Sequence, residues 1–402
     1  MAFSGRAFAL LATVCTLLAG PAQAQKKYGP GVTDTEIKIG QTMPYSGPAS
    51  AYGTIGKASA AYFQMVNEQG GINGRKLNFI SLDDGYSPPR TVEQIRRLVE
   101  EEQVLLLFGT LGTPTNSAIH KYVNVKGVPH VFLNTGATKW GDPKNFPWTI
   151  GWNLSYQNEG HIYARYILET KPDAKIAVLY QNDDYGKDYL KGLKDGLGDK
   201  AAKLIVAEAS YEVTDTTIDS QIVSLQASGA DTFVNITTPK FAAQAVRKVY
   251  DIGWKPLHIL NNVSTSVGSV LTPAGLDKSV GLITAAFYKD PIDPQWKNDP
   301  AVKEYIAWLK KYYPEANVAD SYNLVGYVQA QVMVQMLKQC GDNLTRENVM
   351  KQVTSIKDLQ PGVILPGVKL NTSAEDYFLI TQAQLARFDG KEWKLFGKIL
   401  GR

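Results

Sequence analysis

Cysteine and histidine are scarce in this chain, and their scarcity limits the chemistry it can support. Four histidines occur among the 402 residues, and they show no metal-ligand spacing, lying at positions 120, 130, 161 and 258. Of the two cysteines, Cys15 and Cys340, the second lies in an apolar helical pattern that favours a packed core residue over a nucleophile. We therefore expect no metal site and no cofactor.

The sequence also lacks a concentrated basic surface and a catalytic motif. Lys and Arg number 42 and Asp and Glu 38, without a dense basic run, which argues against nucleic acid as a partner. Gly53–Ala58 lacks the first glycine and the hydroxyl residue of a phosphate-binding loop, and no Gly-x-Ser-x-Gly motif is present. The pairs Asp83-Asp84 and Asp183-Asp184 are more typical of helix caps than of acid–base catalysis. We do not expect an enzyme.

Long apolar runs are missing beyond the first 24 residues. Arg6, the apolar stretch Ala7–Ala19 and the small-residue site Ala22-Gln23-Ala24 together predict a cleaved signal peptide at residues 1–24. The stretch is too short for a comfortable membrane span, and Val14 before Cys15 argues against a lipoprotein site. The mature chain would then keep one cysteine and form no intrachain disulfide.

Strand and helix patterns alternate through most of the chain, which predicts parallel sheets flanked by helices. The predicted strands are Ile37–Gly40, Leu77–Leu82, Val104–Phe108, Pro129–Leu133, Lys175–Tyr180, Lys203–Ala209, Asp231–Ile236 and His258–Leu260. The predicted helices are Ile55–Asn67, Arg90–Glu101, Ser117–Val125, Asn158–Glu169, Tyr185–Leu197, Ile218–Ser228, Lys240–Ile252, Ala301–Tyr313, Asp320–Gln339 and Arg346–Gln352. Asp389-Gly390 predicts a terminal hairpin within Tyr377–Leu400.

Three stretches are candidates for chain crossings between two lobes, and three crossings would form a hinge beside a cleft. They are Thr149–Trp152, Gly281–Ala285 and Gln360–Val368. Trp152 is either hinge packing or a pocket wall.

Several short motifs together resemble the branched-chain amino-acid-binding protein family, the periplasmic receptors of ABC importers. They are Ser46-Gly47-Pro48, Tyr52-Gly53, Val66-Asn67, Gly70-Gly71-Ile72-Asn73-Gly74, Asp83-Asp84, Asp184-Tyr185-Gly186 and Gly229-Ala230-Asp231. The resemblance covers nearly all of the mature chain. It implies an α/β fold of two Rossmann-like lobes, joined by a three-segment hinge, with a ligand cleft between them. Lobe 1 would hold residues 25–150 and 284–358, and lobe 2 residues 151–283 and 359–402.

The resemblance also implies a set of ligand-binding residues. From the first lobe these are Tyr52, Thr113, Asn134, Thr135 and Gly136, and from the second Tyr156, Tyr185, Thr238, Asn262 and Ser264. Thr113 falls where the family grips the ligand carboxylate at a helix N-terminus, although it could simply be an N-cap with Pro114 at the first helical position. Tyr52 and Tyr185 either pack on the ligand or are ordinary rim tyrosines.

One departure from the family pattern concerns the ligand. Amino-acid-binding members place an acid after a second-lobe strand, but the segment His258–Ser266 contains none. Because a buried ammonium needs a carboxylate partner, we expect an organic acid with an apolar or aromatic body instead. The resemblance thus implies a periplasmic receptor, which we expect to be a monomer and to deliver a small carboxylate to a membrane permease of an ABC importer. The alternatives are a receptor for branched-chain or other amino acids, and a ligand-sensing module not coupled to transport.

Overall fold

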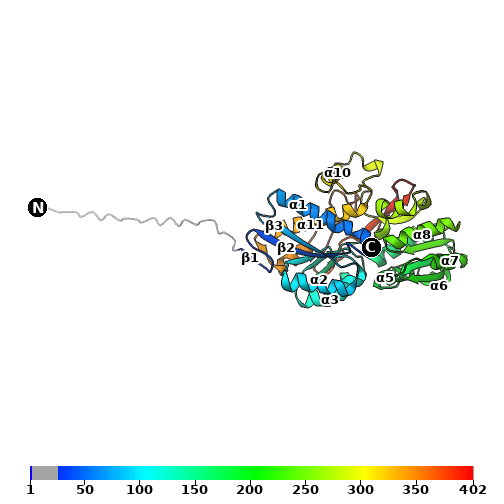
Figure 1. The fold of residues 1–402 in the computed structure, drawn as a ribbon, viewed down its shortest axis with the longest axis horizontal. Helices are drawn as coiled ribbons and strands as arrows, with labels where there is room; N and C mark the ends of the chain where they lie inside the picture. Colours follow the sequence, from blue (N-terminus) through cyan, green and yellow to red (C-terminus); the bar gives the residue numbers. More distant parts are fainter. Residues whose placement is uncertain (2–25, 402) are drawn as a thin grey trace.

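Two sheets, each flanked by helices, lie side by side along the long axis of the molecule (Figure 1). The computed structural model describes residues 1 and 26–401, so the predicted signal peptide lies, apart from Met1, outside the described residues. No helix in the described part of the chain is long and apolar enough to cross a membrane.

The first sheet has five parallel strands in the order β3-β2-β4-β5-β6. Their bounds are Glu36–Met43 (β2), Lys76–Asp83 (β3), Leu106–Phe108 (β4), His130–Leu133 (β5) and Thr149–Gly151 (β6). The helices α1 (Gly53–Glu68) and α11 (Ser321–Cys340) pack on one face, and α2 (Pro88–Arg96) and α3 (Thr113–Val125) on the other (Figure 1). Residues 104–108 are fully buried, as expected for a strand covered on both faces.

The second sheet has seven strands in the order β14-β13-β11-β10-β9-β7-β8. The strands β7 (Ile176–Gln181), β8 (Ile205–Tyr211), β9 (Thr232–Ile236), β10 (Leu257–Leu260) and β11 (Ile283–Ala286) are parallel. The strands β13 (Gln382–Phe388) and β14 (Trp393–Gly401) add the antiparallel hairpin predicted at Asp389-Gly390.

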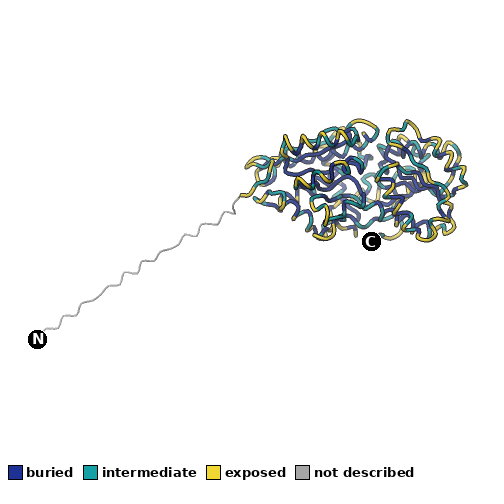
Figure 2. Tube along the Cα trace, turned by 90° about the horizontal axis from the view of Figure 1, so that it is seen from below, coloured by how far each residue is buried: buried dark blue, intermediate teal, exposed yellow. Residues whose placement is uncertain are grey.

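Helices cover both faces of this second sheet. Successive side chains of β7 point to opposite faces of the sheet. Ile176 and Val178 pack with α4 (Tyr156–Thr170) and α5 (Asp184–Leu197) on one face, whereas Ala177 and Leu179 pack with the helices on the other face. That layer contains α7 (Asp219–Ala227) and α8 (Pro239–Asp251). Figure 2 shows the buried backbone running through the interior of both halves, with exposed segments at the periphery.

The remaining elements are short or lie outside the two sheets. They are α6 (Ala201–Leu204), α9 (Thr272–Ala274), α10 (Pro300–Tyr312), α12 (Arg346–Val353), and a two-stranded pairing of β1 (Lys27–Tyr28) with β12 (Asn343–Leu344). Cys340 at the end of α11 is buried, as predicted.

The chain crosses between the halves along neighbouring segments. Leaving the second sheet after β11, it runs antiparallel to the predicted crossing near residue 364, with Tyr288 opposite Ile364. Trp152 is fully buried at the first crossing, and its indole nitrogen donates a hydrogen bond to the Tyr288 hydroxyl at 2.6 Å. Trp152 therefore packs within the crossing segments and does not form a pocket wall.

The predicted α/β fold class is confirmed, with local differences at the element ends. The predicted strand Lys203–Ala209 starts later, because Ala201–Leu204 forms a helical turn. The predicted helix Arg90–Glu101 begins earlier at the proline pair and ends in a wider turn at Arg97–Glu101. Residues 284–286, which we assigned to the first lobe, pair within the second sheet. The division into lobes otherwise stays a prediction.

Candidate functional site

A cavity lies between the two sheets, at the carboxyl ends of their central strands. The β2 and β4 loops enter it from the first sheet and the β7, β9 and β10 loops from the second, which is where open α/β sheets bind ligands. About 1160 Å³ of space, part of it open to solvent, lies within its walls. Seven predicted residues line it: Tyr52, Thr113, Asn134, Tyr156, Tyr185, Thr238 and Asn262.

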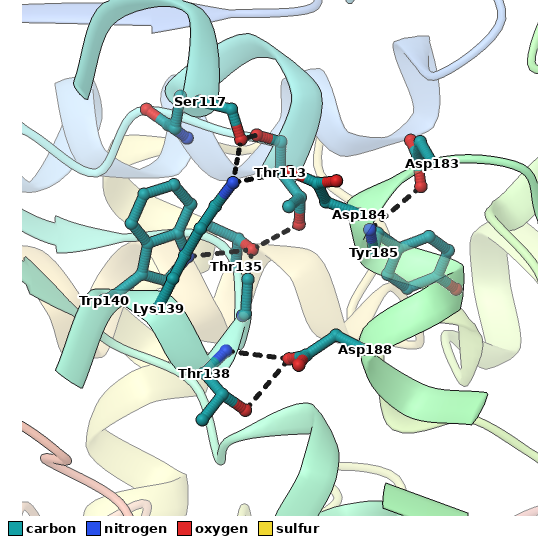
Figure 3. A network of polar contacts seen from close by, with 12 residues as sticks. Thr113, Ser117, Thr135, Thr138, Lys139, Trp140, Asp183, Asp184, Tyr185 and Asp188 are labelled. Atoms are coloured by element: carbon teal, nitrogen blue, oxygen red, sulfur yellow. Dashed lines mark hydrogen bonds and ion pairs between the residues drawn. The ribbon is translucent and has the colours of Figure 1, made fainter. Parts of the chain in front are cut away.

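Thr113 lies at the start of α3, in the cavity wall. It is the first helical residue, whereas Gly112 is the N-cap, so Thr113 is not the cap that we considered. Its hydroxyl lies 2.7 Å from the Thr135 hydroxyl, which in turn accepts a hydrogen bond from the Trp140 indole (Figure 3). No side chain caps the first turn of α3. The free peptide N–H groups of this turn, which starts in the cavity wall at Thr113, therefore have no side-chain acceptor.

A second helix presents its N-terminus to the same cavity from the other sheet. Thr238 is the N-cap of α8, but its side chain makes no capping hydrogen bond. Its hydroxyl lies 3.2 Å from the Tyr211 hydroxyl, which also accepts a hydrogen bond from the Thr238 N–H. By contrast, Asp183 caps α5 by accepting hydrogen bonds from the N–H groups of Tyr185 and Gly186. The starts of α3 and α8 thus reach the cavity from different sheets, and neither has a side-chain cap.

Tyrosine rings form much of the wall around these helix ends. Tyr52 and Tyr322 both donate hydrogen bonds to the backbone oxygen of Val263, at 3.0 and 2.9 Å. Because Tyr52 and Tyr322 belong to the first half and Val263 to the second, these bonds join the two halves across the cavity. Tyr156 and Tyr185 meet edge to face, with centroids 5.3 Å apart.

Asn262 lies on the side of the cavity that the second sheet forms. Its side chain donates to the Ala285 carbonyl at 2.6 Å, and its backbone N–H donates to the Glu159 carboxylate at 2.8 Å. Glu159 is buried behind the wall and also accepts hydrogen bonds from the hydroxyls of Tyr163 and Tyr189. Burial raises the pKa of the Glu159 carboxyl to about 7, against the opposing effect of these hydrogen bonds.

Three predicted site residues lie behind the wall and do not line the cavity. Thr135 is buried between Thr113 and the Trp140 indole. Ser264 is buried and donates to the Thr237 carbonyl. Gly136 lies so close to Leu154 and the Tyr156 ring that a Cβ atom would collide with both. These residues position the wall, since Gly136 also accepts the Tyr156 N–H at 2.8 Å.

An acidic side chain reaches the cavity from outside the segment His258–Ser266, on which the expected ligand class was based. Asp290, on the crossing that follows β11, lines the wall together with Lys289. Lys289 forms an ion pair with Asp299 at 2.6 Å. Burial raises the pKa of the Asp290 carboxyl to about 6. The segment His258–Ser266 does lack an acid, but the cavity extends beyond that segment.

Several other wall residues were not predicted from the sequence. Tyr86 follows β3, Tyr322 lies in the first turn of α11, and Trp393 begins β14. Tyr322 had one weak signal, because Asp320 precedes a strong helical pattern and caps it. No group of three or more metal-ligating side chains occurs within the described residues.

A polar contact joins the halves at the rim (Figure 3). Lys139, in the turn after β5, donates to Ser117 of α3 and forms an ion pair with Asp184 of α5 at 2.6 Å. Next to it, the backbone N–H and hydroxyl of Thr138 donate to the Asp188 carboxylate at 2.7 and 2.9 Å. We call these four contacts, made by Ser117, Thr138, Lys139, Asp184 and Asp188, the rim contact.

Comparison with known proteins gives consistent results for the family and the fold. The family model described as periplasmic binding protein matches residues 36–392. The Leu/Ile/Val-binding protein homolog 7 of Brucella suis is 24% identical over 403 residues, covering 95% of this chain and 93% of that protein.

Two solved structures share the fold. One is a branched-chain amino acid ABC transporter from Thermus thermophilus with bound valine, with TM-score 0.82 and 16% identity, covering 92% of this chain and 98% of that one. The other is a fatty acid ABC transporter substrate-binding protein from Thermomonospora curvata, with TM-score 0.77 and 21% identity, covering 94% and 95%.

Proposed function

The chain belongs to the periplasmic binding protein family, and on this premise we propose that it is the receptor of an ABC importer for a small organic carboxylate. It would bind its ligand in the cavity between the two sheets and deliver it to a membrane permease. We also propose that it acts in the periplasm as a monomer, without a cofactor, after removal of residues 1–24.

The two uncapped helix N-termini carry the carboxylate part of the proposal. Each helix start has a partial positive charge and free N–H groups, which favour an anion. Because α3 and α8 reach the cavity from opposite sheets, we propose that the ligand carboxylate contacts both halves. Thr113 and Thr238 would add hydroxyl groups beside it.

Apolar side chains support a hydrocarbon body for the ligand. Ile55, Leu111 and Leu324 line the cavity from the first half, and Val263 and Val267 from the second. Burying apolar surface between them contributes about 25 cal/mol per Å². A ligand that touches both walls stabilises the arrangement in which they are close, and this is the basis of hinged closure.

A receptor for branched-chain or other amino acids is the second candidate. Asp290 favours it, because it supplies the acidic side chain that the segment His258–Ser266 lacks. The names of the Brucella and Thermus proteins also support it. A sensing module not coupled to transport remains the third candidate, since the same fold serves both roles.

A ligand screen tests the proposal. We expect at least one apolar or aromatic monocarboxylate to raise the midpoint temperature of thermal unfolding of the mature protein. The matched primary amide should not raise it. Ligand at one hundred times its Kd should stabilise the protein by about 2.7 kcal/mol. Leucine, isoleucine and valine belong in the same panel. A response to these three alone would favour the second candidate, and no response to any carboxylate would refute the proposal.

Thr113→Val tests the carboxylate end directly. We expect calorimetric titration with the best acid of the panel to show roughly tenfold weaker binding or more, because a hydrogen bond to a charged group contributes about 1.5–3 kcal/mol. Thr170→Val is the matched control, since its hydroxyl bonds to Tyr166 at the far end of α4. Equal affinities of the two variants would remove Thr113 from the site.

A further inference from the structure

We propose that the hinge end of the cavity is a cation subsite, formed by Asp290 with the rings of Trp393 and Trp296. The ligand would then carry an amine that an apolar segment separates from its carboxylate. This inference rests on the proposed function, because it assumes that the carboxylate binds at α3 and α8.

Asp290 has acceptor capacity that the protein does not use. One carboxylate oxygen accepts the Ile292 N–H at 3.1 Å, and the other lies 3.4 Å from the Trp393 N–H, a long hydrogen bond. No lysine, arginine or histidine within residues 26–401 forms an ion pair with Asp290. A carboxylate in a cavity wall without a cation is a natural partner for an ammonium group.

The nearby cations are already paired with other carboxylates. Lys289 pairs with Asp299 at 2.6 Å, and Lys394 lies 3.2 Å from Asp293 and also pairs with Glu392. Asp290 is therefore the carboxylate of this region whose charge is left without a partner. A cationic ligand group would provide that partner when it enters the cavity.

Two indole rings line the same cavity as Asp290. Trp393 is fixed by a hydrogen bond from its ring nitrogen to the Thr265 carbonyl at 2.9 Å, and it lines the cavity. Trp296 also lines the cavity, and the Lys289 ammonium lies 5.2 Å from its ring centre. Indole faces attract cations, with about 0.5–2 kcal/mol per contact, so they favour the same ligand group as the carboxylate.

The subsite is distinct from the carboxylate end. Asp290 follows β11, whereas Thr238 follows β9, and β10 lies between these two strands. Adjacent strands lie about 4.8 Å apart, so the two loops start roughly 10 Å apart. An α-amino acid carries its amine and carboxylate on one carbon, so both groups would bind near one of the two loops. An ω-amino acid with an extended chain would reach both loops.

Paired probes test this inference by calorimetric titration of the mature protein. The pairs are 6-aminohexanoate with hexanoate and 8-aminooctanoate with octanoate, which differ only in the terminal amine. For at least one pair we expect the amino acid to bind tenfold tighter or more. Asp290→Asn should reduce that preference to less than threefold.

Glu392→Gln is the matched control. It removes the same charge from the same region, but Glu392 does not line the cavity, so the preference should persist. Thermal melting and near-UV circular dichroism check that each variant folds, and Asp290→Ser serves if the asparagine variant does not.

The outcomes separate the two proposals. If plain acids bind and the amine brings no preference, or if Asp290→Asn and Asp290→Ser keep the preference, the cation subsite is refuted while the carboxylate receptor stands. A response to leucine alone also refutes the subsite. If no carboxylate binds at all, both proposals fail.

Discussion

Glu159 shows how one residue behind a binding wall controls the residues in front of it. Its carboxylate accepts hydrogen bonds from the Asn262 N–H and from the hydroxyls of Tyr163 and Tyr189. Tyr189 in turn stacks on Tyr156, a ring of the cavity wall, at 4.3 Å. Glu159 therefore fixes both an amide and an aromatic ring that we propose to contact the ligand, without reaching the cavity itself.

The raised pKa of Glu159 predicts a pH-dependent stability. Its pKa is 4.5 in the unfolded chain and about 7 in the fold, because burial penalises the charged form. Between these values the folded protein binds more protons, so rising pH lowers the free energy of unfolding. The free energy of unfolding thus falls by about 3 kcal/mol in total, and this loss is complete above about pH 7.

Glu159→Gln should remove this dependence. In urea unfolding, we expect its free energy of unfolding relative to wild type to rise by about 3 kcal/mol between pH 4.5 and pH 8. Glu169→Gln, which removes a carboxylate from the exposed end of the same helix, is the matched control. Parallel curves for Glu159→Gln and wild type would contradict the assigned role.

At the scale of elements, α4 and α5 pack against each other through glycines. A Cβ atom on Gly192 would lie 2.3 Å from the Gln157 Cα atom, and one on Gly160 would lie 2.6 Å from the Leu193 nitrogen. The two helices therefore approach more closely than any larger residue allows. This contact places Tyr156 and Tyr185, at the starts of the two helices, side by side in the cavity wall.

Gly192→Ala should destabilise the protein although alanine favours helices. Overpacking of this kind costs about 1–3 kcal/mol, more than the roughly 1 kcal/mol gained from helix propensity. Denaturant unfolding measures the difference. Lys187→Ala, on the exposed side of α5, is expected to change stability by less than about 0.5 kcal/mol. A stabilised Gly192→Ala variant would show that the helices can move apart freely.

The elements themselves were largely predictable, because local patterns determine them. Fully apolar runs such as Val104–Phe108 indicated buried strands, and Asp389-Gly390 indicated the hairpin. The predicted strand Lys203–Ala209 wrongly included the last two residues of the helical turn Ala201–Leu204. These helix-favouring residues directly precede the observed strand β8. The close packing at Gly160 and Gly192 could not be predicted from local sequence, since a glycine within a helical pattern usually indicates only a less stable helix.

At the scale of the molecule, the rim contact holds the two halves together beside the cavity. The Lys139 and Asp184 side chains are 37% and 61% exposed, so water screens their attraction. Exposed ion pairs contribute about 0–1 kcal/mol, and the two Thr138 hydrogen bonds to Asp188 add a similar amount each. The contact therefore biases the position of the halves without fixing it.

The double variant Lys139→Ala/Asp188→Ala should favour the separated arrangement. We expect its affinity for the best ligand to fall by roughly five- to thirtyfold, since about 1–2 kcal/mol of closing free energy is lost. Small-angle scattering of the unliganded variant should give a larger radius of gyration than that of wild type. Lys171→Ala, which removes an ion pair to Asp231 within the second half, is the control. An unchanged affinity and radius would show that the rim contact has no influence on closure.

The site was less predictable than the fold, because its residues come from segments that lie far apart in the sequence. Seven of the ten predicted residues line the cavity. They were predictable because the family resemblance selects residues at the ends of strands, where the cavity lies. The sequence segment near Asn262 could show that it lacks an acid, but not that Asp290 reaches the cavity from another crossing. Glu159 was missed for the same reason, since it contacts Asn262 from about one hundred positions earlier.

The cavity wall combines residues from both ends of the described chain, and this has a consequence for the kinetics of folding. Tyr52 and Trp393 line one cavity although nearly the whole described chain separates them. Closing such long loops costs conformational entropy, and contacts between distant residues form late in folding. The ligand would thus recognise only the finished molecule. It should slow unfolding while leaving the rate of refolding unchanged, and a partly folded chain should be unable to capture it.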